Sequence, residues 1–274
     1  ELADSPLLRM LGRVKATRKR RPGLPRRTRP TVSPPPLPSA MMAGRTTDHT
    51  SACTQRCVDI MIVTSNLPVG HKAHMPKVDL EVKLVNKVVR PQWSTKTVKQ
   101  PDGFSGLRCS LSRYRAKNLH LVMHGDAEAY CTDDDGGTPL CAMLYTLGLV
   151  KKDGSLDIVD PRDIVALLEP YSVMNGGDTE FIFLNACRSD GYGMSLNAKG
   201  FVVVCWSTRV NDAAAQPFAV AFYEARVKNN ASWQEAFDFA VKIISVDFEL
   251  RDPDDVTTTP ATTKDAAGIP KLFL

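Results

Sequence analysis

The sequence lacks the features that mark several common protein classes. No apolar run reaches the length of about 18 residues that a membrane-spanning helix needs, which excludes a transmembrane segment. Neither a G-x-G-x-x-G fingerprint nor a P-loop occurs, so nucleotide chemistry has no support. The seven cysteines are odd in number, show no small-scaffold spacing and follow no secretory signal. This argues against a disulfide framework and for free thiols in a reducing compartment.

The sequence has enough apolar residues for a hydrophobic core, and its charged residues are unevenly distributed. Hydrophobic residues make up 43% of the 274 positions, which suits one large domain or two small ones. Ten of the 35 Lys and Arg residues lie within residues 1–30, beside only two acids. The rest of the chain carries 25 basic and 28 acidic side chains, so the net charge of +5 belongs to a basic N-terminal arm.

The basic arm, which we place at residues 1–52, also contains the proline run TVSPPPLPSA and has no apolar periodicity. Such a composition cannot bury enough surface to offset chain entropy, so we expect the arm to be disordered. Its segment RKRRPGLPRRTR is typical of a solvated tail, a nuclear address, a nucleic-acid or membrane-surface patch, or part of a transit peptide. We expect an intracellular protein, cytoplasmic or nuclear. The first residue is Glu rather than Met, which is consistent with a fragment of a larger protein.

Beyond the arm, short apolar runs alternate with amphipathic segments, which predicts strands that alternate with helices. The predicted strands are Val58–Ser65, Trp93–Val98, Asn118–Gly125, Glu180–Cys187, Gly200–Ser207 and Ile269–Leu274. The predicted helices are Lys77–Val89, Asp102–Asn118, Asp160–Tyr171, Asp212–Asn229 and Ser232–Ser245. In the first of these helices Leu80, Leu84 and Val88 form the apolar stripe, and residues 252–268 resemble a flexible stretch. The alternation indicates an α/β domain over residues 53–274, with a largely parallel sheet covered on both faces.

Two of the predicted strands end in chemically reactive residues. His124 lies near the carboxyl end of the strand NLHLVMHG, and Cys187 lies at the carboxyl end of the strand EFIFLNAC. The reactive groups of a parallel sheet gather at the carboxyl ends of its strands. If the two strands are neighbours, a thiolate at Cys187 can attack a carbonyl carbon while His124 accepts and donates protons as general acid/base. Gly125 has no Cβ, which lets its N–H approach the developing oxyanion beside the N–H of Cys187. The alternative for Cys187 is an inert buried thiol.

The order of these motifs resembles a known family. HLVMHGD, followed 63 residues later by FIFLNACRSDGYG, is similar to the His-Gly and Ala-Cys-Arg motifs of caspase-fold cysteine proteases of clan CD. VVVCWSTRVNDAAAQPFAVAFYEA and SWQEAFDFA look closer to the CHAT branch of that superfamily. The resemblance covers about residues 57–245. It implies a caspase-like three-layer sandwich, with His124 as general acid/base, Cys187 as nucleophile, and the N–H groups of Gly125 and Cys187 as the oxyanion hole.

The sequence departs from the family's patterns at the positions that read substrate. Asn185 stands where metacaspases and clostripain place an acidic residue that reads a basic P1 side chain, and no Gln precedes Ala186 as it does in caspases. Asp212 matches an aspartate that in separase-like relatives resembles part of a P1-Arg pocket, although a helix N-cap is its ordinary role. Trp206 ends a predicted strand at the active edge, where it would line the pocket or pack in the core. We name Asn185, Trp206 and Asp212 as candidate substrate-binding residues.

Two patterns suggest metals but fit them poorly. Cys53, Cys57, His71 and His74 have spacings at or outside the limits of zinc sites, and a predicted core strand lies between the two pairs. The segment TDDDGG, residues 132–137, lacks the ligand spacing of an EF-hand and is typical of a solvated acidic loop. We expect neither a metal nor an organic cofactor.

The sequence predicts a cysteine endopeptidase that works through a Cys187–His124 dyad and a thioester acyl-enzyme. Its protein or peptide substrate would bind by strand addition beside the Trp206 segment. Two rivals stay open. One is a catalytically silent caspase-like module that binds a regulatory protein partner. The other, nucleic-acid binding by residues 9–29, concerns the arm alone and would be salt-sensitive.

Overall fold

The structure is a computed structural model that describes residues 55–71, 73–127, 146–255, 257 and 263–274. All of these residues belong to one of the two units into which the chain divides, residues 51–274. The predicted disordered arm, Cys53 and the acidic segment 132–137 lie outside the described residues.

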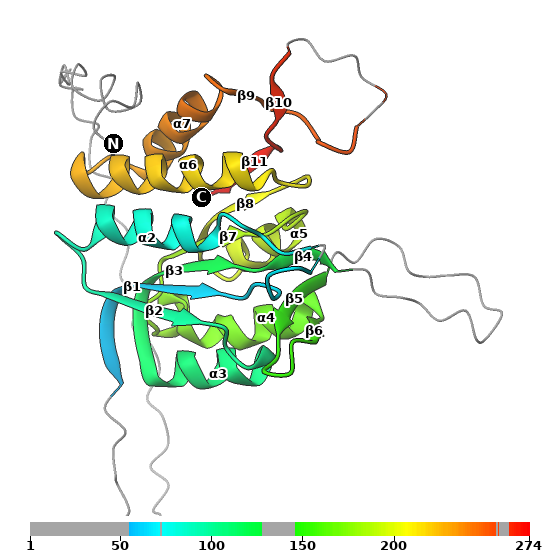
Figure 1. Cartoon of the computed structure of the whole chain (residues 1–274). Coiled ribbons are helices and arrows are strands. Elements are labelled where there is room, and N and C mark those ends of the chain that lie inside the picture. Colours follow the sequence, from blue (N-terminus) through cyan, green and yellow to red (C-terminus); the bar gives the residue numbers. More distant parts are fainter. Residues whose placement is uncertain (1–54, 72, 128–145, 256, 258–262) are drawn as a thin grey trace, which may run out of the picture. The chain divides into compact units, whose positions relative to one another are not determined.

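A six-stranded sheet forms the middle of this unit, in the order β11-β8-β7-β3-β1-β2 (Figure 1). The pairs β1–β2, β1–β3, β3–β7 and β7–β8 are parallel, and β11 joins β8 antiparallel. The strands are β1 (Arg56–Thr64), β2 (Thr95–Lys99), β3 (Tyr114–Val122), β7 (Phe181–Asn185), β8 (Val202–Trp206) and β11 (Pro270–Phe273). The near-continuous apolar runs of the central strands suit a sheet that is buried on both faces.

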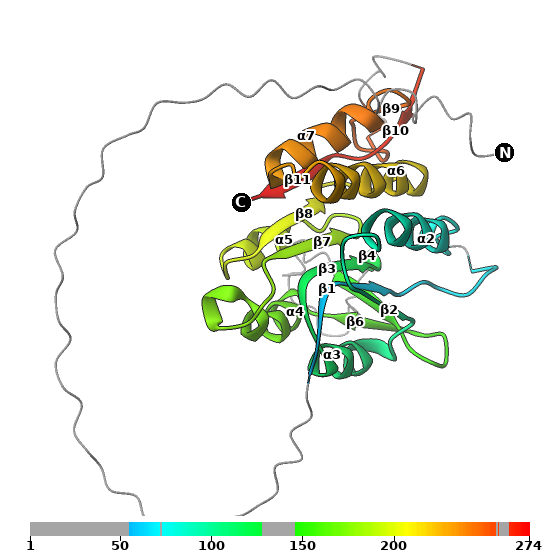
Figure 2. The same cartoon turned by 90° about the vertical axis from the view of Figure 1, so that its left-hand side faces the viewer.

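Helices cover both faces of this sheet (Figures 1 and 2). On the face to which Phe181 and Phe183 point lie α2 (Val78–Val89), α6 (Asp212–Tyr223) and α7 (Trp233–Ile244). On the face to which Ile182 and Leu184 point lie α3 (Gly103–Arg113), α4 (Pro161–Leu168) and α5 (Asp190–Asn197). This alternation along β7 is the two-residue period of a strand. The predicted α/β class, a mostly parallel sheet flanked by helices, is confirmed.

Local sequence signals set where the helices begin. Ser232 and Glu235 form a reciprocal capping box at the start of α7. Asp160 caps α4 and is followed by proline at the first helical position. Asn211 caps α6 by accepting a hydrogen bond from the N–H of Ala213 at 2.9 Å.

A second sheet, of three strands, begins at the carboxyl edge of the first. In it, β4 (His124–Ala127), β5 (Thr146–Val150) and β6 (Leu156–Val159) pair antiparallel. Our prediction missed β5 and β6, because a short apolar run with a central glycine such as TLGLV carries no clear period. Shorter elements are η2 (Glu169–Tyr171), η3 (Val173–Asn175), η4 (Glu224–Lys228), β9 (Phe248–Glu249) and β10 (Asp265–Ala266).

The predicted helix Asp102–Asn118 is wrong in its second half. The helix α3 ends at Arg113, and Tyr114 already has the extended backbone of β3, with φ −129° and ψ 134°. The reason is long-range pairing, because β3 runs beside the whole of β1, from Arg56 opposite Tyr114 onward. Tertiary contacts override a weak helical pattern here.

The strand β11 confirms a predicted strand and corrects the predicted mode of substrate binding. Pro270 pairs with Trp206 and Phe273 with Val203. Just beyond, the N–H of Ser207 donates to the carbonyl of Ile269 at 2.9 Å. Strand addition of a substrate beside the Trp206 segment is therefore wrong for this structure, because β11 already pairs with the backbone groups there.

Candidate active site

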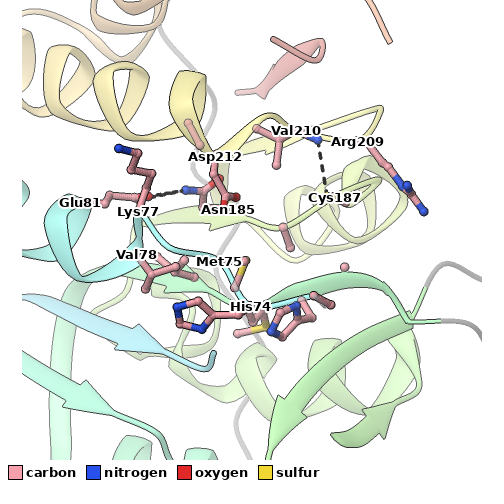
Figure 3. A pocket seen from close by; sticks show the side chains of 17 residues that line it. His74, Met75, Lys77, Val78, Glu81, Asn185, Cys187, Arg209, Val210 and Asp212 are labelled. Carbon is pink, nitrogen blue, oxygen red and sulfur yellow. Dashed lines mark hydrogen bonds between the residues drawn. The ribbon is translucent and has the colours of Figure 1, made fainter. Parts of the chain in front are cut away.

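The pairing register of β3 and β7 brings the two reactive residues to the same place. Val122, the last residue of β3, pairs with Asn185, the last residue of β7. His124 and Cys187 each follow two positions later, so they leave the sheet at the same edge and at matching depth. Both line one cavity of about 400 Å³ (Figure 3). The expectation that their strands are neighbours is confirmed.

Gly125 packs directly on the backbone of Cys187. A Cβ atom at Gly125 would lie 2.0 Å from the carbonyl oxygen of Cys187 and 2.6 Å from its nitrogen. Real Cβ atoms do not approach backbone so closely, so only glycine fits at this position. The absent side chain thus lets two backbone segments meet beside the thiol, the condition that a two-amide oxyanion hole requires.

His124 begins β4 rather than ending β3, because the long strand breaks at Met123. Its Nε2 accepts a hydrogen bond from the N–H of Leu67 at 3.2 Å, which leaves the proton of the neutral ring on Nδ1. Burial, and to a smaller extent the nearby His71 and His74, lowers the pKa of His124 to about 4. The imidazole is therefore neutral at pH 7.

The depressed pKa of His124 predicts a loss of stability in acid. Unfolding frees the ring to bind a proton below its ordinary pKa of about 6.5, so stability is fully present above that pH and falls as the pH drops toward 4. The expected loss is about 3 kcal/mol. Urea unfolding at pH 7 and pH 4 should show this loss in the wild type and a smaller one in His124→Asn. Equal losses in the two proteins would contradict the assignment.

Cys187 lies at a sharp turn that follows β7. The next residue, Arg188, has φ +46°, a left-handed conformation that costs a non-glycine residue about 1 kcal/mol. The turn is held because the N–H of Arg188 donates to the carbonyl of Thr208 at 2.9 Å and the N–H of Ser189 donates to that of Trp206 at 2.7 Å. The Sγ of Cys187 is half-buried and accepts the N–H of Val210 at 3.5 Å.

Asn185 joins a buried hydrogen-bond network below the cavity. Its Nδ2 donates to both carboxylate oxygens of Glu81 at 2.9 Å, and its Oδ1 accepts from the indole N–H of Trp206 at 3.0 Å. Glu81 also bonds the Nε2 of His120 at 2.8 Å, and the Nδ1 of that ring faces the hydroxyl of Tyr223 at 3.1 Å. The network joins β3, β7 and β8 to helices α2 and α6 and fixes the amide of Asn185.

Sequence reasoning missed Glu81. The predicted apolar stripe of α2 was Leu80, Leu84 and Val88, but Leu80 is 40% exposed. The face that packs on the sheet instead carries Val78, Val82 and Val85, with Glu81 among them and only 2% exposed. An acid three residues after one buried valine and four before another was the signal that could have found it.

Trp206 does not contact the cavity. Its side chain is fully buried and packs on Phe218 with ring centroids 5.2 Å apart. The candidate role of Trp206 as a substrate contact is therefore wrong for this structure. It is a core residue whose indole N–H orients Asn185.

Asp212 lines the cavity as the first residue of α6. The N-cap role that we weighed for it belongs to Asn211. Burial, with a smaller effect of the neighbouring Glu81, raises the pKa of Asp212 to about 6, while His74 opposes the shift. Figure 3 shows Glu81, Asn185 and Asp212 close together at one end of the cavity, and Arg209 at the other end beyond Cys187.

The cysteine and histidine residues of the zinc-like pattern that the structure describes lie at opposite ends of a strand. Cys57 lies exposed near the start of β1, whereas His71 and His74 follow the end of that strand. Within the described ranges, no group of three or more His, Cys, Asp or Glu residues could hold a metal ion. No helix in the same ranges is both long and apolar enough to cross a bilayer.

Comparison with known proteins gives structural likeness only. No protein-family model and no curated protein matches the sequence. Caspase-1 from Spodoptera frugiperda is 12% identical with a TM-score of 0.48, over 80% of this chain and 86% of that one. Its pro-form is 12% identical with a TM-score of 0.47, over 84% and 94%. A secreted C11 cysteine protease from Bacteroides thetaiotaomicron, in complex with an irreversible peptide inhibitor, is 7% identical with a TM-score of 0.46, over 74% and 62%.

Proposed function

We propose that the protein is a caspase-like cysteine endopeptidase, of the CHAT type by its motifs. The observation that carries the proposal is the register of β3 and β7, which places His124 and Cys187 at one edge around one cavity. The close packing of Gly125 on the backbone of Cys187 supports it. A structural thiol needs none of these neighbours, whereas acyl transfer needs all of them.

In the proposed reaction, the thiol proton of Cys187 passes to His124 as the sulfur attacks the peptide carbonyl carbon. The N–H groups of Gly125 and Cys187 stabilise the oxyanion. His124 then gives its proton to the leaving amine, and the C–N bond breaks to leave a thioester. Water hydrolyses the thioester and restores the thiol, with His124 again transferring the protons.

The resting state of His124 adds one requirement. Its Nε2 lone pair accepts the N–H of Leu67, so Nε2 can take a proton only if that hydrogen bond is released. Nδ1 can accept only after the ring changes tautomer. Either step costs about the net value of one hydrogen bond, roughly 1 kcal/mol, which is compatible with catalysis.

A positional-scanning library of fluorogenic peptides tests the function, run with and without calcium. We expect the wild-type protein to hydrolyse a subset of the library, and a matching peptidyl electrophile to modify Cys187 in preference to Cys109, an exposed thiol on α3. Peptide mapping by mass spectrometry locates the modified residue. Neither cleavage nor preferential modification would favour the silent interaction module instead.

A further inference from the structure

A second histidine, His74, lines the same cavity as Cys187 and His124 and lies between β1 and α2. We infer that His74 is a second acid/base of this site, whose Nε2 takes a proton from the water that hydrolyses the thioester. The inference rests on the proposed peptidase function and deepens it. It also gives a role to one histidine of the zinc-like pattern, for which the described residues offer no metal site.

The two imidazoles of the cavity are both bonded to one residue, Leu67. The N–H of Leu67 donates to the Nε2 of His124 at 3.2 Å, and its carbonyl accepts from the Nδ1 of His74 at 2.6 Å. Because the N and O atoms of one residue are close together, the two bonded ring nitrogens lie within about 10 Å of each other. Leu67 is only 4% exposed, so a buried residue holds both rings in place.

These hydrogen bonds leave the two rings in different states. A carbonyl oxygen can only accept, so the Nδ1 of neutral His74 carries the ring proton and its Nε2 keeps a lone pair. Within the described part of the chain, this Nε2 has no hydrogen-bond partner. The lone pair of His124 already accepts the N–H of Leu67. His74 is therefore the ring that presents an unoccupied proton acceptor in the resting structure.

Side-chain hydrogen bonds close the loop that carries His74. The amide nitrogen of Asn66 donates to the carbonyl of Met75 at 2.8 Å, and the N–H of Met75 donates to the Oδ1 of Asn66 at 2.9 Å. His74 precedes Met75, so these two hydrogen bonds hold its backbone at the cavity wall. The His74 side chain is half-buried there (Figure 3), which lets water from the cavity reach the ring.

The charges around the cavity favour a proton on His74 while His124 is neutral. The carboxylate of Asp212 and a charged His74 attract each other, which is why His74 opposes the rise in the pKa of Asp212. By the same interaction, Asp212 stabilises the imidazolium that His74 becomes when it takes a proton. Charged forms of His74 and His124 repel each other, and this repulsion contributes to the low pKa of His124. The cavity therefore favours one imidazolium at a time.

Hydrolysis of the thioester is the step that needs a second base most. Cysteine is appreciably nucleophilic near neutral pH, whereas water is a much weaker acid and needs a base in order to attack. The water oxygen bonds to the acyl carbon as the Nε2 of His74 takes one water proton, and the carboxylic acid product keeps the other. The C–S bond breaks, and Cys187 leaves as a thiolate. His74 releases its proton to solvent while His124 carries one from solvent to the sulfur, so both rings end neutral.

A peptidyl p-nitrophenyl ester of the best library sequence tests this role, because its good leaving group makes thioester hydrolysis the slow step. In His74→Asn, the amide nitrogen can still donate to the carbonyl of Leu67, but the base at Nε2 is lost. We expect the nitrophenolate burst, which reports acylation, to change less than about 3-fold and the steady-state rate to fall about 10²-fold. Intact-mass spectrometry should then show accumulated acyl-enzyme.

His71→Asn is the matched control. His71 lies on the same loop and its charge also acts on His124, but it is exposed and does not line the cavity. This variant should keep both the burst and the steady-state rate. In His74→Ala, added imidazole should restore the steady-state rate as its concentration rises, whereas His71→Ala should not respond. The rescue separates a lost base from a lost contact and decides alone if His74→Asn does not fold.

The burst distinguishes failure of this inference from failure of the proposed function. A wild-type burst with an unchanged steady-state rate in His74→Asn would overturn the role of His74 and leave the peptidase standing. Equal losses of the burst and the steady-state rate, or no rescue of His74→Ala by imidazole, would assign His74 to structure alone and overturn the inference as well. A wild-type protein with neither a burst nor modification of Cys187 by a peptidyl electrophile would sink both.

Discussion

Replacing Cys187 by alanine is expected to lower peptide hydrolysis by a factor of at least about 10³. The change removes the thiol that forms the acyl-enzyme in the proposed mechanism, while the cavity, His124 and the oxyanion donors stay in place. Cys187 is half-buried and alanine keeps its backbone and Cβ, so we expect the variant to fold.

Cys109→Ala and Cys205→Ala are the matched controls for this prediction. Cys109 is exposed on α3, and Cys205 is fully buried in β8, where burial raises its pKa well above the ordinary value and keeps it inert. Initial rates on the best library substrate, with circular dichroism to confirm folding, provide the comparison. Hydrolysis that survives in Cys187→Ala but not in a control would show that another thiol does the chemistry.

The second large effect is expected at Gly125. Gly125→Ala places a methyl group 2.0 Å from the carbonyl oxygen of Cys187, so β4 or the turn after β7 must move. Because an oxyanion donor must lie within hydrogen-bond distance of the developing charge, we expect kcat to fall by about 10² to 10³. The KM should change less, since the added methyl group meets the backbone of Cys187 rather than the rest of the cavity wall.

Gly191→Ala is the control for that substitution. Gly191 lies in α5, where an added Cβ meets nothing within 4 Å, and alanine there should stabilise the helix by about 0.5–1 kcal/mol. Steady-state kinetics and thermal unfolding of the two variants would be compared. A Gly125→Ala protein with wild-type kcat would rule out the backbone arrangement proposed for the oxyanion hole.

The sequence predicts that each reactive residue lies at the end of a strand, because short-range signals suffice for that. Each reactive residue follows an apolar run, and parallel strands place their carboxyl ends at one edge. Whether the two strands are neighbours is not local information. The motif resemblance supported it, and the pairing of Val122 with Asn185 confirms it. The prediction of strand character at Phe181–Asn185 succeeded for the same reason, since all five residues are buried.

The residues in and around the cavity were harder to predict, because each depends on a partner far along the chain. Trp206 packs inward because Phe218 of α6 lies over it. Glu81 was missed because a helix reveals its buried face only once its rotation against the sheet is known. Leucines at Leu80 and Leu84 outweighed three valines in the pattern, yet the valines pack on the sheet. Apolar periodicity predicts that a helix is amphipathic, but hydrogen bonds to His120 and Asn185 decide where an acid fits.

The neighbouring positions of β3 and β7 have a consequence for the order of folding. Their two reactive residues are 63 positions apart in the chain, so they meet only after a long loop has closed. Strands β1, β2 and β3 follow one another in sequence, whereas the pairing of β3 with β7 joins segments far apart in the chain. Such non-local parallel pairing is slow. Because His124 and Cys187 follow the two paired strands, the reactive pair forms only when β3 and β7 have paired.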